Sequence, residues 1–205
     1  MNEKFFDLKK EKQDRMINAA LKVFAKNGYG HASTDDIVRE AGISKGLLFH
    51  YFISKLGLYS FVYDYSVRYM ILELTTGVDR QETDFFELIA QIKEAELQVM
   101  KTYPYMLLFL KSSLWENVSE ALVETEEKRT ILPEKYAEIM QHADVHEIER
   151  QCNVQHLVQM IDFTAEGLMR KQFAEEAFQP ELYHEDFMQY LKTLKQLTKK
   201  EQGGI

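Results

Sequence analysis

The sequence has little cysteine, proline or glycine, and each shortage limits its structural class. The single Cys152 excludes an intrachain disulfide and fits a reducing compartment, so we expect a cytoplasmic protein. Only 3 prolines and 9 glycines interrupt 205 residues rich in good helix formers, which favours an all-α fold. The chain also lacks the run of about 18 apolar residues that a membrane-spanning helix needs. Its charged start, MNEKFFDLKKEKQDR, has no apolar core of a signal peptide, so no membrane partner is expected.

The charges are unevenly distributed along the chain. The net charge of −8 by itself argues against a nucleic-acid partner. Residues 1–60 nevertheless carry 10 Lys and Arg against 7 Asp and Glu, whereas residues 61–205 carry 15 against 26. A polyanionic partner should therefore meet the N-terminal end, although so small an excess also arises by chance.

Hydrophobic periodicity predicts helices along most of the chain. Ser33 and Ser44 each precede a short apolar-faced segment as candidate caps, and Gly42 lies between these segments as a turn residue. Two short helices joined by a glycine turn have the spacing of a helix-turn-helix. The predicted helices span 11–27, 34–41, 45–51, 54–76, 84–101, 104–127, 133–147, 151–174 and 180–200.

The stretch TDDIVREAGISKGLLFHYFISK, residues 34–55, closely resembles the DNA-binding motif of TetR-type bacterial transcriptional regulators. The resemblance covers roughly residues 11–60. It implies a three-helix DNA-binding domain over residues 1–55, joined by a long fourth helix to a helical ligand-binding and dimerisation domain over 56–205. It also implies a sequence-specific regulator, a repressor released from its operator by a small-molecule ligand, with no cofactor and no enzymatic activity.

In such regulators the third helix enters the major groove, and most contacts go to phosphates. By motif position, Lys45 and His50 are expected at base edges or phosphates and Leu48 at a thymine methyl, while Leu47 and Phe52 pack inward. Two departures from the family pattern are Phe49, where tyrosine is frequent, and Gly57, where a larger or acidic residue is usual. The residues expected at DNA are Ser33, Thr34, Ser44, Lys45, Gly46, Leu48, Phe49, His50, Tyr51 and Lys55.

The C-terminal region is expected to bind a ligand and to form a homodimer, and ordinary core packing within one chain would give the same patterns. The candidate ligand pocket comprises Tyr65, Tyr69, Met100, Tyr103, Met106, Phe109, Trp115, Met160 and Phe163. The candidate dimer interface comprises Leu157, Ile161, Leu168, Phe187, Tyr190, Leu191 and Leu194.

Two further interpretations are weighed against these. His142 and His146, like Cys152 and His156, stand four residues apart, a spacing that can place metal ligands on one helix face. Polar positions near a helix junction explain the same residues, and we expect no metal. An all-helical enzyme or an interaction adaptor is the alternative function, but no Gly-x-Ser-x-Gly, Walker or His-Glu-x-x-His motif is present.

Overall fold

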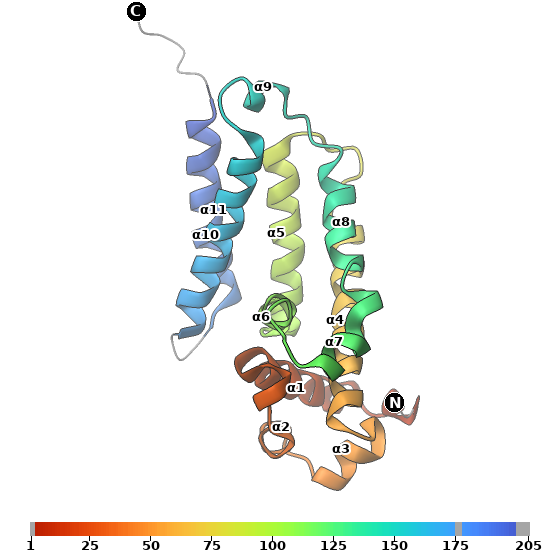
Figure 1. Ribbon diagram of the computed structural model, residues 1–205. Helices are drawn as coiled ribbons and strands as arrows, with labels where there is room; N and C mark the ends of the chain where they lie inside the picture. The colour runs from red at the N-terminus through yellow and green to blue at the C-terminus, as the bar shows by residue number, and fades with distance from the viewer. Residues whose placement is uncertain (1–2, 175–177, 200–205) are drawn as a thin grey trace, which may run out of the picture. The chain divides into compact units, whose positions relative to one another are not determined.

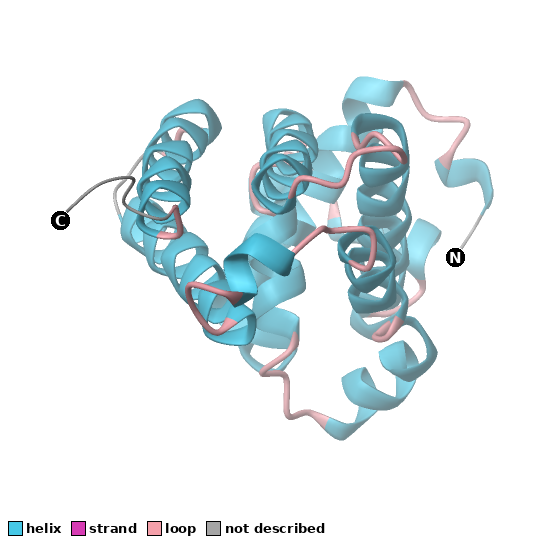
Figure 2. Cartoon of the chain, turned by 90° about the horizontal axis from the view of Figure 1, so that it is seen from above, coloured by secondary structure: helices cyan, strands magenta, loops and turns pink. Residues whose placement is uncertain are grey.

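The computed structural model describes residues 3–174 and 178–199. Over these ranges helices are joined by turns, with no strand, which confirms the all-α prediction (Figure 2). The helices, labelled in Figure 1, are η1 (Glu3–Phe5), α1 (Lys10–His31), α2 (Thr34–Ala41), α3 (Lys45–Phe52), α4 (Lys55–Gly77), α5 (Phe85–Thr102), α6 (Met106–Ser113), α7 (Ser119–Thr125), η2 (Glu126–Lys128), α8 (Ile131–Met140), α9 (His146–Glu149), α10 (Val154–Ala174) and α11 (Pro180–Leu197).

Two predicted helices are shorter than their periodicity indicates. The segment 104–127 is divided into α6 and α7, because the Glu116 carboxylate accepts the N–H groups of Asn117 and Val118 and so closes a turn between them. The segment 133–147 ends early, at Met140. Local hydrogen bonds of an acidic side chain compete with the helix in ways that apolar spacing does not reveal.

The predicted stop at Gly28 is a kink rather than the end of the first helix. Gly28 has φ +64° and ψ 176°, a conformation that its missing Cβ makes accessible. The helix then continues for one more turn to His31. This last turn brings Tyr29 toward Glu116, whose carboxylate accepts the Tyr29 N–H at 2.7 Å.

The chain divides into two compact units, each described by itself. Unit 1 contains residues 1–73 and 99–135, and unit 2 contains residues 74–98 and 136–205. This division differs from the expected boundary after residue 55, because α1 packs against α6 as well as against α2. The N-terminal helices therefore share one core with parts of the chain far along the sequence.

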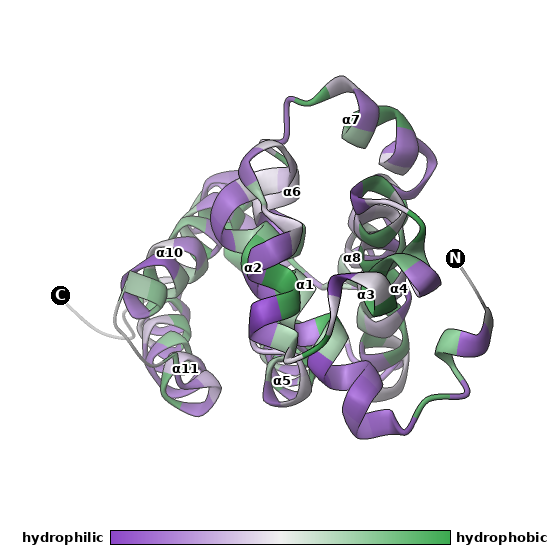
Figure 3. Cartoon of the chain, turned by 90° about the horizontal axis from the view of Figure 1, so that it is seen from below, coloured by the Kyte–Doolittle hydropathy of each residue, from purple (hydrophilic) through white to green (hydrophobic). Residues whose placement is uncertain are grey.

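The core of unit 1 is largely aromatic. Tyr59 of α4 lies at its centre, with its ring centroid 5.1 Å from Phe24 and from Tyr29 of α1 and 5.6 Å from Phe109 of α6. Such edge-to-face pairs contribute beyond the area they bury. Polar and apolar residues are mixed along α1 (Figure 3), and its buried residues include Met16, Ala20 and Phe24.

In unit 2, α10 and α11 run side by side (Figure 1). Leu157, Ile161, Phe187 and Leu191 are buried within the unit. Close by, the buried Lys93 ammonium lies 2.8 Å from a Glu96 carboxylate oxygen and 5.1 Å from the centroid of the Phe187 ring. The Tyr136 hydroxyl donates to the other Glu96 oxygen at 3.0 Å, so this buried pair is compensated within the unit. No helix in the described ranges is long and apolar enough to span a bilayer.

Candidate nucleic-acid interface

The turn between α2 and α3 is held by hydrogen bonds of its own backbone. Gly42 lies in the left-handed region at φ +62° and ψ 41°, where glycine avoids a Cβ clash. Its N–H donates to Arg39 O at 3.3 Å, and the Ile43 N–H donates to Val38 O at 3.0 Å. The final carbonyls of α2 are thus satisfied, and the chain is redirected into α3.

Serine side chains begin both helices of the motif, as predicted. Ser33 Oγ accepts the Asp35 N–H at 3.1 Å, and Ser44 Oγ accepts the Leu47 N–H at 3.2 Å. Each cap uses the serine oxygen as an acceptor. The hydroxyl protons are then able to donate to a phosphate oxygen beside the positive end of each helix.

The short helix α3 buries one face and exposes the other. Leu48, Tyr51 and Phe52, spaced as i, i+3 and i+4, are buried. Phe5 of η1 packs against the two aromatic residues, at centroid distances of 5.7 Å from Tyr51 and 5.1 Å from Phe52. The exposed residues at the start and on the other face are Ser44, Lys45, Gly46 and His50. One apolar helix can therefore serve both packing and recognition.

The predicted roles of two neighbouring leucines are exchanged. The sequence assigns Leu48 to a thymine methyl and Leu47 to the core. In the structure Leu48 is only 1% exposed, whereas Leu47 is half-buried. The prediction for Leu48 is wrong because the buried stripe that continues to Phe52 runs through position 48. Leu47 is the leucine with surface left for DNA.

Tyr51 is buried as well, and the phosphate contact expected of its hydroxyl stays a prediction. Its ring makes edge-on contacts with Phe5 and with His50, the latter at a centroid distance of 5.0 Å. We therefore assign Tyr51 to anchoring α3 and to supporting His50. Phe49 is half-buried and keeps part of its surface.

Lys55 is engaged inside unit 1 rather than free to bind a phosphate. Its ammonium donates to Tyr29 O at 2.9 Å and to Ala32 O at 3.3 Å. It also lies 4.3 Å from the centroid of the Tyr29 ring, within cation–π distance. Two of its three N–H donors therefore hold the end of α1 against the start of α4, and its predicted role is corrected to a structural one.

Two acidic residues of α2 pair with cations near the exposed face, and the sequence interpretation did not include them. Asp35 accepts from the Lys45 ammonium with both oxygens, at 2.9 and 3.1 Å. Asp36 pairs with Arg39 on the same helix. The Asp36–Arg39 pair could have been predicted from its i, i+3 spacing on one helix. Asp35 and Lys45 stand ten residues apart, and only the turn at Gly42 brings them together.

The candidate pocket residues do not form one group. Met100, Tyr103, Met106 and Phe109 are buried in unit 1. Three others are exposed: Trp115 at 78%, Phe163 at 69% and Met160 at 52%. The prediction that these three line an apolar pocket is wrong, because their side chains face solvent.

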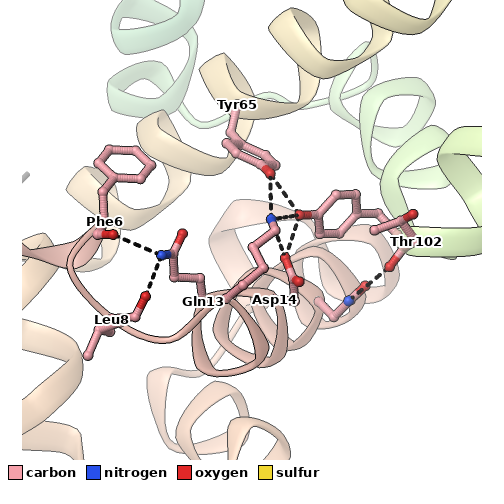
Figure 4. A network of polar contacts seen from close by, with 9 residues as sticks. Phe6, Leu8, Gln13, Asp14, Tyr65 and Thr102 are labelled. Carbon is pink, nitrogen blue, oxygen red and sulfur yellow. Dashed lines mark hydrogen bonds and ion pairs between the residues drawn. The ribbon is translucent and has the colours of Figure 1, made fainter.

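Tyr65 and Tyr103 take part in a polar network within unit 1 (Figure 4). The Tyr103 hydroxyl donates to an Asp14 oxygen at 2.6 Å and lies 2.7 Å from the Tyr65 hydroxyl. The Lys10 ammonium lies 2.7 Å from the same Asp14 oxygen. Burial and the Asp14 carboxylate both raise the pKa of Tyr103, so its hydroxyl stays a neutral donor. The network ties α1 to Tyr65 of α4 and to the segment that follows α5.

Most of the candidate dimer residues are used inside one chain. Leu157, Ile161, Leu168, Phe187 and Leu191 are buried in unit 2. For these five, the prediction of a subunit contact is wrong, because α10 and α11 turn their stripes inward. Of the predicted set, Tyr190 is exposed and Leu194 is half-buried.

The four residues weighed as metal ligands are not gathered into a site. His142 lies in the turn after α8, His146 begins α9, and Cys152 precedes α10, so the i, i+4 spacings do not fall on continuous helices. Within residues 3–174 and 178–199, no cluster of three or more His, Cys, Asp and Glu side chains is placed to hold a metal ion.

Comparisons with known proteins agree with this geometry. Residues 16–60 match the family model described as bacterial regulatory proteins, tetR family. The HTH-type transcriptional regulator YuxN of Bacillus subtilis is 34% identical over 93 residues, which are 43% of this chain and 32% of that protein. The regulator UidR of Escherichia coli is 46% identical over 44 residues, 22% of each chain. The matched stretches span about a third or less of these relatives.

Two crystal structures share the fold over nearly the whole chain. A TetR family transcriptional regulator from Chloroflexus aurantiacus has a TM-score of 0.62 at 19% identity, covering 95% of this chain and 96% of its own. The regulator PfmR from Thermus thermophilus has a TM-score of 0.60 at 18% identity, covering 91% and 100%. These similar proteins bear the names of transcriptional regulators, not of enzymes. Residues 16–60 therefore carry the N-terminal domain of the tetR family of bacterial regulatory proteins, and the whole chain shares the fold of the TetR family structures.

Proposed function

We propose that this protein is a homodimeric, sequence-specific DNA-binding transcriptional regulator. The observation that carries the proposal is the division of α3 into a buried face anchored on Phe5 and an exposed face with Lys45, Gly46 and His50. A helix whose buried face is anchored and whose other face is exposed is able to enter the major groove, which admits one α-helix. Chromosomal DNA as the target places the protein in the cytoplasm.

Base recognition is assigned to Lys45 and His50. Lys45 reaches a guanine edge or a phosphate once DNA competes with Asp35 for its ammonium, because the Asp35–Lys45 pair is exposed and weak in water. Gly46 carries no side chain, and a Cβ there would meet nothing within 4 Å, so the space beside it is open to DNA. His50 is held by its edge-on contact with Tyr51.

Phosphate contacts are assigned to the helix starts. Ser33 and Thr34 lie at the beginning of α2, and Ser44 lies at the beginning of α3. Unpaired N–H groups and the helix dipole favour an anion at both positions. These contacts set the register of the protein on the duplex and account for most of the affinity.

The homodimer is assigned to apolar side chains that α10 and α11 leave exposed. Each of these side chains keeps between 36% and 75% of its surface exposed in a single chain, and two chains related by a twofold axis would cover them together. The residues are Val158, Met160 and Phe163 on α10 and Leu182, Tyr190 and Leu197 on α11. Two copies then present two reading helices to the half-sites of a palindromic operator.

Repression and release by a small molecule are the regulatory part of the proposal. A ligand that binds better to one of two arrangements of the dimer shifts the population away from the DNA-competent one. We retain Tyr65, Tyr69 and the buried Met100, Tyr103, Met106 and Phe109 as its candidate contacts, since all six belong to unit 1 and adaptable Met and aromatic side chains suit apolar ligands.

Selection of duplexes from a random-sequence DNA pool tests this function. The protein should enrich an inverted repeat and bind it more weakly as salt rises, because phosphate contacts release counterions. Lys45→Ala and His50→Ala should each change which sequence is enriched, whereas Glu73→Ala, outside α2 and α3, should not. Unchanged preference in both variants would show that the assignment of the base-reading residues is wrong.

A further inference from the structure

The turn that ends α3 holds a residue in an unusual conformation. Ile53 has φ +66° and ψ −46°, and it is the one non-glycine residue with positive φ among those the structure describes. A β-branched side chain is an outlier in that region, because its Cβ crowds the backbone. Strain of this kind persists only where the surrounding structure enforces it, and it gathers at functional sites.

Gly57 leaves room for this turn because it has no side chain. A Cβ built on Gly57 would lie 2.2 Å from Phe52 O, a distance that real Cβ atoms do not reach. The same Phe52 oxygen accepts the Ser54 N–H at 2.7 Å, and Ser54 Oγ accepts the Gly57 N–H at 2.9 Å. The turn therefore lies close against the first turn of α4, and Ile53, between Phe52 and Ser54, has its positive φ within this turn.

The position of Ile53 continues the exposed face of α3. It follows His50 by three residues and Phe49 by four, and its N–H still donates to Phe49 O at 3.0 Å. Its side chain is 75% exposed. Between residues 34 and 60, which the structure describes without a gap, no other large hydrophobic side chain is exposed. Burial in the protein core therefore does not explain why a strained position carries an isoleucine.

We propose that Ile53 is a specificity-determining residue whose branched side chain contacts the C5-methyl group of a thymine in the major groove. The inference rests on the proposed function, in which α3 enters that groove. The thymine methyl is the apolar group on the base edges there, and apolar side chains read it. Because the tight turn already fixes the Ile53 backbone, little backbone freedom is lost when the contact forms.

Uracil substitution in a selected duplex tests the contact directly. A duplex enriched by the wild-type protein is remade with uracil in place of each thymine in turn, which removes only the methyl group. Wild type should lose about threefold to tenfold in affinity at one thymine per half-site. Ile53→Asn should bind the thymine duplex with a similar loss and should not distinguish it from the uracil duplex.

Two further variants complete the test. Ile53→Gly removes the same side chain and should repeat the loss of affinity and of sensitivity to uracil. Because glycine adopts positive φ without a Cβ clash, this variant should melt no lower than wild type. Val123→Asn, which changes an equally exposed residue of α7, should leave DNA binding unchanged. An Ile53→Asn protein that keeps wild-type affinity and wild-type sensitivity to uracil would overturn the inference alone. A wild-type protein that enriches no duplex would overturn the proposed function together with it.

Discussion

Replacing Gly57 by alanine separates the local preference of a helix from the packing of this particular turn. Gly57 lies in the first turn of α4, where alanine is better than glycine by about 0.5–1 kcal/mol on helix propensity alone. The sequence therefore predicts that Gly57→Ala stabilises the protein. The structure predicts the opposite, because the new Cβ would meet Phe52 O at 2.2 Å.

The size of the effect follows from that distance. Real Cβ contacts stay above 3.0 Å, so Phe52 O must move by at least the difference, 0.8 Å. The shift disturbs the 2.7 Å hydrogen bond from the Ser54 N–H and displaces Phe52 from its packing against Phe5. Forced shifts in a packed region cost about 1–3 kcal/mol, and a lost hydrogen bond costs about 1 kcal/mol. After the gain in propensity, the net destabilisation should be about 1–3 kcal/mol.

Urea unfolding of three glycine variants measures this effect with internal controls. At Gly46 in α3 and Gly167 in α10, a Cβ would meet nothing within 4 Å, so alanine should stabilise each variant by about 0.5–1 kcal/mol. Gly57→Ala should unfold at lower urea than wild type. If Gly57→Ala is as stable as the two controls, the tight approach of Phe52 O to α4 does not exist in solution.

Two further predictions concern residues whose roles the structure defines. Lys55→Met keeps most of the length of the side chain but removes the donors to Tyr29 O and Ala32 O. It should therefore lower the free energy of unfolding by about 1–3 kcal/mol in the absence of DNA. Unchanged stability together with weaker DNA binding would instead show that Lys55 binds a phosphate. Asp84→Ala should cost about 1 kcal/mol near neutral pH, because Asp84 Oδ1 accepts the Glu87 N–H at 2.9 Å at the start of α5. Burial alone would raise the pKa of Asp84, but the Glu87 N–H and the Lys195 ammonium outweigh it and hold the pKa below its usual value. The stabilisation by Asp84 is therefore full above its pKa in the unfolded chain and is lost as the pH falls through its pKa in the folded protein. Urea unfolding should show that the free energies of unfolding of wild type and Asp84→Ala become equal in acid. A difference between the two that stays constant with pH would contradict this assignment.

The local features of the motif could be predicted from the sequence because each depends on near neighbours. Ser33 and Ser44 bond N–H groups two and three residues away, and Gly42 closes onto the preceding helical turn. The buried face of α3 could not be predicted in the same way. This helix is apolar on most sides, and the face that is buried depends on residues far along the chain, such as Phe5, which packs against Tyr51 and Phe52.

The same limit applies to the rest of the candidate site. The Lys55 ammonium donates to carbonyls 23 and 26 residues away, and residue spacing within one helix does not predict such hydrogen bonds. The apolar stripes of α10 and α11 correctly predicted that these segments are helical. Whether such a stripe is buried within one chain or contacts a second subunit depends on which elements pack together. Phe163 is exposed, whereas Phe187, a residue of the same type, is buried.

We propose that two copies of this chain present two α3 helices to one duplex. Sedimentation of the protein with a fluorescent duplex enriched from a random pool measures this most directly, because it gives the number of chains per duplex and the loss of binding with salt. We expect two chains on an inverted repeat whose half-site centres lie about one helical turn, 34–36 Å, apart or a multiple of it. One chain per duplex, or a protein that sediments apart from every duplex at low salt, would contradict it.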